Sequence, residues 1–393
     1  IDRGERNLLY IVVINERGEI IEQCSLNKIV NTYQEKEHTV DYKALLEKRS
    51  QSRLEERKSW QTIENIKELK GGYLSQVVHK IAQLMIKYNA FAVLEDLNFG
   101  FIRTRKQFEF SVYQEFEKKL IDKLGYVVDK KAPIQQEGGL LQAYQLTAPF
   151  KSFREMGKQN GFLFYVPAWN TSAIDPRTGF VNLLDTRYES IAKTKELIKK
   201  LKDIRYNSPK DWFEIDLDYN AFGNRAKGSR SKWRLCTYGE RIEHTRKQDS
   251  NGQEGSDSVI VLTEAFKDVF TKYQIDYREN LKEQILLQSD KAFFVDFLSL
   301  LRLTLQLRNS LSNSLIDYIL SPVADENGEF FDSRKALSNE PQDADANGAY
   351  HIALKGLWVL DKIRKTEKVT PAKLALSNQE WLSFAQEKPF LNE

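Results

Sequence analysis

Cysteine is scarce in this sequence of 393 residues: Cys24 and Cys236 are the only two, and they lie far apart along the chain. Their number and separation exclude a disulfide scaffold and a zinc site built from cysteine alone. The sequence also lacks an apolar run of about 18 residues, and no signal peptide precedes the first strand-like segment. We therefore expect a protein of the reducing cytoplasm with no membrane contact.

A strong excess of one charge is lacking as well. Lysine and arginine number 59, aspartate and glutamate 56, and the formal net charge is +3. Because the two signs are interleaved, a groove for an anionic partner has to come from the fold rather than from composition. The 41% hydrophobic and 29% charged residues are typical of a globular chain. A chain of this length predicts roughly two or three compact units.

Hydrophobic periodicity, in contrast, is clear and is typical of an α/β layer. The apolar run 8–14 predicts a strand, and 20–26 predicts its hairpin partner. Amphipathic spacing predicts helices at 74–88, directly after a pair of glycines, and at 109–124. Further short strands are predicted at 90–94, 126–128 and 162–166. Together these segments predict a mixed sheet flanked by helices.

Two stretches depart from this pattern. Residues 41–70 are rich in charge and free of proline and glycine, which predicts a solvated helical segment that carries Trp60. From about 170 to 341 the pattern is irregular, and strong helical periodicity then returns. We interpret the irregular region as an inserted domain, because the last helix has an apolar face suited to dock on the first domain.

Three acidic residues stand where a rigid fold would support them. Asp2 precedes a glycine-containing turn, Glu95 ends a predicted buried strand, and Asp345 lies at the start of the last predicted helix. Three converging carboxylates can hold two Mg²⁺ ions about 4 Å apart, the spacing used for in-line phosphodiester cleavage. Mg²⁺ prefers oxygen ligands, so the four histidines are not required.

Each acid also has an ordinary structural interpretation. Asp2 can be a turn former, Asp345 can be a helix N-cap, and Glu95 can face solvent at its strand end. Taken singly, these interpretations outweigh catalysis, and the spacing of the acids does not decide the matter.

The segments around the acids resemble the three RuvC segments of the subtype V-A CRISPR effector endonucleases, the Cas-twelve-a family. The resemblance runs in order over essentially the whole chain, which makes it far more specific than any one short word. The matching segments are 1–6 (IDRGER), 72–79 (GYLSQVVH), 94–98 (LEDLN), 143–147 (AYQLT), 179–182 (GFVN), 307–310 (LRNS), 331–334 (FDSR) and 343–350 (DADANGAY).

The resemblance implies an α/β fold: an RNase H-like (RuvC) domain with a mixed sheet flanked by helices, interrupted by a bridge helix and by an inserted α+β Nuc domain. Trp60 would be the bridge helix's anchoring aromatic toward another lobe, although it can equally cover the core of its own domain. The implied boundaries are RuvC-I 1–46, bridge helix 47–65, RuvC-II 66–168, Nuc 169–341 and RuvC-III 342–393.

The resemblance also implies a site. The family's metal ligands fall on Asp2, Glu95 and Asp345, whereas Asp343 is a neighbour that is not a ligand. The ions would be two Mg²⁺, for which Mn²⁺ can substitute. Arg308 falls on the arginine that assists cleavage and Asp317 on a nearby acid, so that all five are the implied catalytic residues.

Zinc is not expected, because residues 171–179 have no cysteine where related zinc-binding nucleases carry pairs. Four basic residues are candidate contacts to a nucleic-acid backbone, with surface solvation as the plainer interpretation: Arg3, Arg6, Lys67 and Lys70.

The implied function is that of the catalytic lobe of an RNA-guided DNA endonuclease in antiviral defence of a prokaryotic cell. Its partners would be guide RNA, the target and non-target DNA strands, and the remaining lobe of the same effector. Because only Ile1 precedes Asp2, we expect the chain to be a window on a longer protein that folds poorly alone, and we expect guide-RNA processing to reside elsewhere.

Three other functions remain open at the level of sequence. One is a transposon-encoded or resolvase-like RNase H-fold nuclease that acts without a CRISPR guide. A second is a catalytically inactive nucleic-acid-binding module, and a third is a purely structural domain. Missing zinc cysteines and the Nuc-like insertion count against the first, and the intact Asp2, Glu95 and Asp345 count against the second. The third would leave the acids scattered on the surface.

Overall fold

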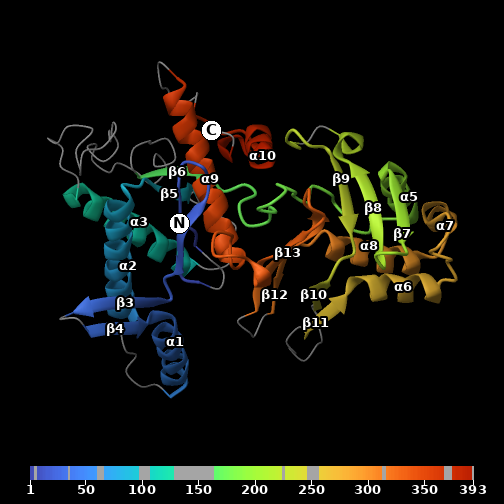
Figure 1. The fold of residues 1–393 in the computed structure, drawn as a ribbon. Helices are drawn as coiled ribbons and strands as arrows, with labels where there is room; N and C mark the ends of the chain where they lie inside the picture. The colour runs from blue at the N-terminus through green and yellow to red at the C-terminus, as the bar shows by residue number, and fades with distance from the viewer. Residues whose placement is uncertain are drawn as a thin grey trace. The chain divides into compact units, whose positions relative to one another are not determined.

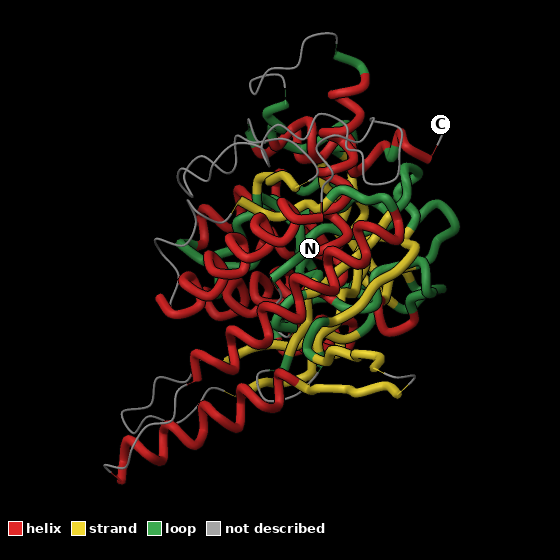
Figure 2. The backbone as a smooth tube through the Cα atoms, turned by 90° about the vertical axis from the view of Figure 1, so that its left-hand side faces the viewer, coloured by secondary structure: helices red, strands yellow, loops and turns green. Residues whose placement is uncertain are grey.

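The computed structural model describes residues 1–3, 7–33, 36–59, 66–96, 107–127, 163–223, 226–245, 256–311, 316–366 and 374–391. The chain divides into two compact units. The first unit comprises Ile1–Ile14, Ile21–Trp169 and Ile352–Leu376, and the second comprises Asn15–Ile20, Asn170–His351 and Ser377–Glu393. Each unit combines helices with short strands (Figures 1 and 2). Among the helices that the structure describes, none is long and apolar enough to cross a membrane.

Strand pairing in the first unit is both antiparallel and parallel. Strand β1 (Tyr10–Ile14) is paired with β2 (Ile20–Ser25), and β5 (Ala92–Asp96) runs parallel to β6 (Leu163–Pro167). Residues 1–3 lie between these pairs. The backbone of Asp2 exchanges two hydrogen bonds of 2.9 Å with Tyr10, and the Ile1 nitrogen donates to the Val93 carbonyl at 3.0 Å.

Two helices supply the core beside these strands. Helices α2 (Ile66–Tyr88) and α3 (Gln107–Val127) carry apolar residues at helical spacing. The buried members from the two helices and from β5 form one cluster, which includes Leu74, Val77, Ile81, Leu94, Phe116, Leu120 and Leu124. The predicted amphipathic faces of both helices are confirmed.

Two predictions about element boundaries were wrong, and one hairpin was not predicted. Helix α2 does not begin after the paired glycines but runs through Gly71 and Gly72, because buried Tyr73 and Leu74 hold the segment and tertiary packing overrides propensity. The strand predicted at 126–128 is wrong at its described positions, since α3 continues to Val127. The antiparallel hairpin of β3 (Lys28–Tyr33) and β4 (Lys36–Asp41), which precedes helix α1 (Tyr42–Ser59), was not predicted.

The described residues of the second unit form three small sheets. Strands β7 (Asp203–Asn207), β8 (Trp212–Asp218) and β9 (Lys232–Cys236) form an antiparallel sheet. Strands β12 (Arg308–Ser310), β13 (Asp317–Ala324) and β14 (Phe330–Asp332) form a second, and the third is a hairpin of β10 (Glu240–Thr245) and β11 (Ser256–Val261). The α-helices described in this unit are α5 (Ile191–Lys200), α6 (Leu262–Lys272), α7 (Leu281–Leu287), α8 (Lys291–Thr304) and α10 (Asn378–Glu387). Helix α9 (Ala344–Arg364) begins in the second unit and belongs to the first unit from Ile352 on.

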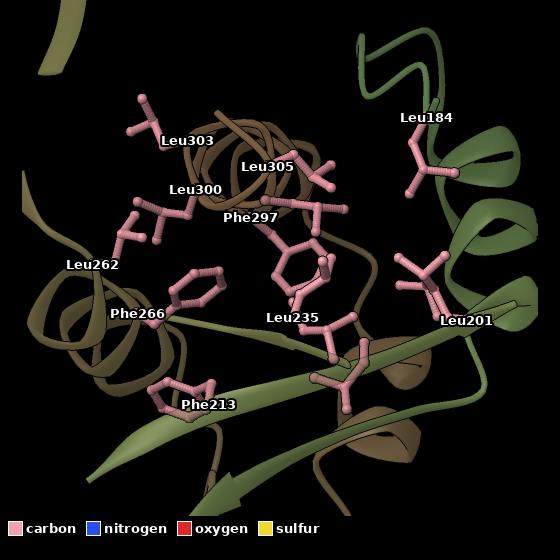
Figure 3. Packing of buried hydrophobic residues seen from close by; sticks show 14 of the residues in the cluster. Leu184, Leu201, Phe213, Leu235, Leu262, Phe266, Phe297, Leu300, Leu303 and Leu305 are labelled. Atoms are coloured by element: carbon pink, nitrogen blue, oxygen red, sulfur yellow. The ribbon is translucent and has the colours of Figure 1, made fainter. Parts of the chain in front are cut away.

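An aromatic core holds the second unit together. Figure 3 shows Phe213 of β8, Phe266 of α6 and Phe297 of α8 pointing toward one another. Ring centroids are 5.5 Å apart for Phe213 and Phe266 and 6.1 Å apart for Phe266 and Phe297, within the range of favourable aromatic pairs. The region that is irregular in sequence therefore has a well-packed core of its own.

Candidate functional site

The two aspartates at the start of helix α9, Asp343 and Asp345, make different contacts. The Asp343 carboxylate accepts a hydrogen bond of 2.7 Å from the Ala346 backbone, and the Asp343 carbonyl accepts the first helical bond from Asn347. These two contacts make Asp343 the N-cap of the helix. Asp345 is therefore not the cap, and its side chain is fully buried. Its carboxylate faces a different partner.

That partner is Arg308, the first residue of β12. Its Nη2 donates to Asp345 Oδ1 at 3.0 Å. The same guanidinium makes a two-point contact with Asp317, with 3.1 Å from Nε to Oδ1 and 2.7 Å from Nη2 to Oδ2. Such a fork fixes the plane of the guanidinium as well as its position.

The register of β12 and β13 explains why this contact forms. Arg308 lies opposite Ile319, and Asp317 lies opposite Ser310, so that Arg308 and Asp317 are diagonal neighbours on one face of the strand pair. The Asp317 side chain is only 4% exposed, and that of Arg308 is 19% exposed. Asp317 thus orients Arg308, and Arg308 carries positive charge to Asp345.

Negative charge is in excess around this arginine. The pKa of Asp343 is raised to about 6, mainly by burial and also by the charges of Asp345 and Asp317, while the Ala346 N–H and Arg308 oppose the rise. Three carboxyl groups thus share one guanidinium within this cluster. An acidic cluster of this kind attracts cations, and its oxygens are of the type that Mg²⁺ prefers.

The other two predicted ligands lie in the first unit. Glu95 is near the end of β5 and is 9% exposed, which excludes the solvent-facing interpretation. Asp2 is half-buried on the short segment beside β5. Burial raises the pKa of the Tyr113 hydroxyl, and the charges of Glu95 and Asp2 are among the further causes, so both carboxylates act on one phenol. Tyr113 also donates to the Glu95 carbonyl at 3.4 Å.

Sequence reasoning missed one residue near Glu95. Lys355 on α9 is 1% exposed and interacts electrostatically with the Glu95 carboxylate. Its signal was present in the sequence, because Lys355 interrupts the apolar stripe formed by Ile352, Trp358 and Val359. A lysine inside such a stripe is buried with a partner or reaches past it to solvent.

The other predicted residues are the four basic candidates for backbone contacts and Trp60. Arg3 and Lys70 are half-buried, and Lys67 lies on α2 with a side chain outside the described set. Arg6 and Trp60 lie outside the described residues. Residues 47–59 are helical as part of α1, but their role as a bridge helix, like the five domain boundaries, stays a prediction.

A metal centre cannot be read directly from these side chains. Within the described part of the chain, no group of three or more His, Cys, Asp or Glu side chains is arranged to hold a metal ion. In chemical kind, however, the buried carboxylates Glu95, Asp317 and Asp345 fit a hard divalent cation and do not fit a soft one.

Comparison with known families agrees with this chemistry. The family profile of the RuvC nuclease domain matches residues 1–390, almost the entire chain. Nucleases of this kind hydrolyse nucleic acid and typically use divalent metals. The chain therefore belongs to the RuvC nuclease domain family.

Proposed function

We propose that this chain is the nuclease lobe of an RNA-guided DNA endonuclease of the subtype V-A CRISPR type, with Asp2, Glu95 and Asp345 as ligands of two Mg²⁺ ions. The observation that carries the proposal is that the two aspartates at the start of α9 make different contacts. Asp343 caps the helix, which leaves the fully buried Asp345 carboxylate for a charged partner. One residue is enough to cap the start of a helix. The buried Asp345, two residues after the cap, is therefore not needed for capping, and a buried carboxylate is costly without a positive partner.

The chain's own residues have distinct tasks in this proposal. Asp2, Glu95 and Asp345 bind the ions through carboxylate oxygens. When bound, Mg²⁺ activates a water molecule and neutralises charge on the scissile phosphate. Arg308 brings a permanent positive charge to the phosphate, while the two-point contact of its Nε and Nη2 with Asp317 keeps the guanidinium plane fixed. Asp317 acts through Arg308 and is a positioning residue.

Guide dependence rests on the ordered set of subtype V-A segments along the chain. In such an effector, base pairing with the guide selects the sequence and the protein contacts the strands through backbone charge and shape. The near balance of acidic and basic residues agrees with a local groove rather than a uniformly basic surface. The partners are accordingly guide RNA, both DNA strands and the rest of the effector.

The test is Mg²⁺-dependent cleavage of single-stranded DNA by the complete guide-loaded protein, with Asp2→Ala and Glu95→Ala beside the wild type. Loss of a metal ligand removes several kcal/mol of transition-state stabilisation, so cleavage should fall by at least about 100-fold while guide-dependent DNA binding is retained. Undiminished cleavage in both variants would make these acids structural. Cleavage that needs no guide would instead indicate a resolvase-like or transposon-encoded nuclease.

A further inference from the structure

A buried ammonium group lies in the first unit close to Glu95. Lys355 is 1% exposed, and its Nζ donates hydrogen bonds of 2.6 Å to the carbonyls of Pro167 and Trp169. Carbonyl oxygens satisfy the protons of an ammonium group but not its unit charge. A buried ammonium group either loses its proton or is kept charged by an opposite charge nearby.

The Glu95 carboxylate acts electrostatically on this ammonium group. Burial lowers the pKa of Lys355 to about 7, and the charge of Glu95 opposes this shift and favours the charged form. The parallel register of β5 and β6 sets Glu95 opposite Val166 and Asp96 opposite Pro167. The Pro167 carbonyl that Lys355 binds is therefore at the same end of the strand pair as the Glu95 side chain.

Close packing holds Lys355 at this position. The next residue, Gly356, lies so near β5 that a Cβ atom built on it would be 2.5 Å from Val93 Cγ2. This distance is shorter than any ordinary carbon contact, so the α9 backbone at Gly356 packs directly on the Val93 side chain. Glu95 lies two residues later on β5 and therefore on the same face of the strand as Val93. The flanking Leu354 is also buried, so the Lys355 side chain has little freedom to swing away.

We propose that Lys355 is a positioning residue of the nuclease site, which holds the Glu95 carboxylate through a buried ion pair and the end of β6 through two carbonyl hydrogen bonds. This inference rests on the proposed function, because it takes Glu95 as a metal ligand. Lys355 compensates the charge of Glu95 until a metal ion arrives. Divalent ions then bind a carboxylate whose place is already set.

Two variants separate this role from a simple tether of β6. Lys355→Met keeps the length and apolar stem but removes the ammonium, and Glu95→Gln keeps the shape but removes the carboxylate. The two are combined in a double-mutant cycle. Lys365→Met, an exposed lysine just past the same helix, is the matched control.

The measurement is hydrogen exchange of β5 and β6 in the full-length protein, with and without Mg²⁺. Each single variant should speed exchange by about tenfold or more, because each leaves one buried charge without its partner. In the Lys355→Met background, adding Glu95→Gln should slow exchange again, because neither charge of the pair is then left buried without the other. Mg²⁺ should slow exchange more in Lys355→Met than in the wild type, because the ion replaces the missing cation. Lys365→Met should match the wild type in every respect.

Two outcomes would overturn the inference. If the effects of Lys355→Met and Glu95→Gln are additive, Lys355 serves only the carbonyls of β6. An equal response to Mg²⁺ in Lys355→Met and wild type would mean that the lysine does not prepare Glu95 for metal. Failure of the proposed function is recognised separately, because Glu95→Gln alone would then cleave DNA at the wild-type rate.

Discussion

The two-point contact between Arg308 and Asp317 makes a prediction that can be worked out from the structure. Arg308→Ala leaves two acids without their cation, namely Asp317 at 4% exposure and Asp345 fully buried. Breaking a buried pair from one side costs about 3–5 kcal/mol, so we expect a loss of stability of that size. Arg308→Lys keeps the charge but loses the fork, which should cost about 1.5–3 kcal/mol for one charged hydrogen bond.

Catalysis should follow the same order. Removal of one preorganised donor from the transition state slows cleavage by about 10²–10³-fold, which is the expectation for Arg308→Ala. Arg308→Lys should lie between this variant and the wild type, because a lysine cannot keep the two-point contact with Asp317 while it serves a phosphate.

The assays are denaturant unfolding and single-turnover cleavage of single-stranded DNA, with Arg302→Ala as the control. Arg302 is 58% exposed and approaches Glu243 at 3.5 Å, so its loss should change stability by no more than about 0.5 kcal/mol. The reasoning is refuted if Arg308→Lys equals the wild type in both assays. It is refuted as well if Arg308→Ala is no more destabilising than Arg302→Ala.

Three further predictions concern helices α9 and α2. Because burial raises the pKa of Asp343 from 3.8 to about 6, the folded state binds this proton more tightly than the unfolded state, so stability falls as pH rises through this interval. Asp343→Asn, which can still cap the helix, should remove that part of the pH dependence in thermal unfolding; an unchanged profile would contradict the assignment. Gly356→Ala should cost about 1–3 kcal/mol by overpacking against Val93, measured by denaturant unfolding. Gly71→Ala, where a Cβ meets nothing within 4 Å, should instead stabilise α2 by about 0.5–1 kcal/mol, and a loss of stability there would show that the helix is not continuous.

Local periodicity was sufficient to predict several elements of the fold and the burial of one of the acids. The run at 8–14 became β1, the helix at 109–124 became α3, and Glu95 proved to be buried near a strand end. These predictions succeed because a helix or strand with one buried face repeats its apolar residues at a fixed spacing, which can be read from that segment alone. The β3–β4 hairpin was missed, since its residues carry little apolar alternation and no glycine turn.

The contacts within the site depended on information that no single segment contains. Which aspartate caps α9 follows from hydrogen bonds at the helix start, and both Asp343 and Asp345 are compatible with that role in sequence. The Arg308–Asp317 fork depends on the register of two strands. The role of Lys355 depends on its hydrogen bond to Pro167 at the end of β6, which lies 188 residues earlier in the chain.

The central claim is that Asp345 is a ligand and Asp343 a cap, and one pair of substitutions tests it most directly. Mg²⁺-dependent DNA cleavage should be compared between Asp345→Asn and Asp343→Asn in the complete guide-loaded protein. The account predicts that Asp345→Asn loses cleavage by at least about 100-fold, whereas Asp343→Asn stays within about tenfold of the wild type. Wild-type cleavage by Asp345→Asn, or an equal loss in both variants, would contradict it.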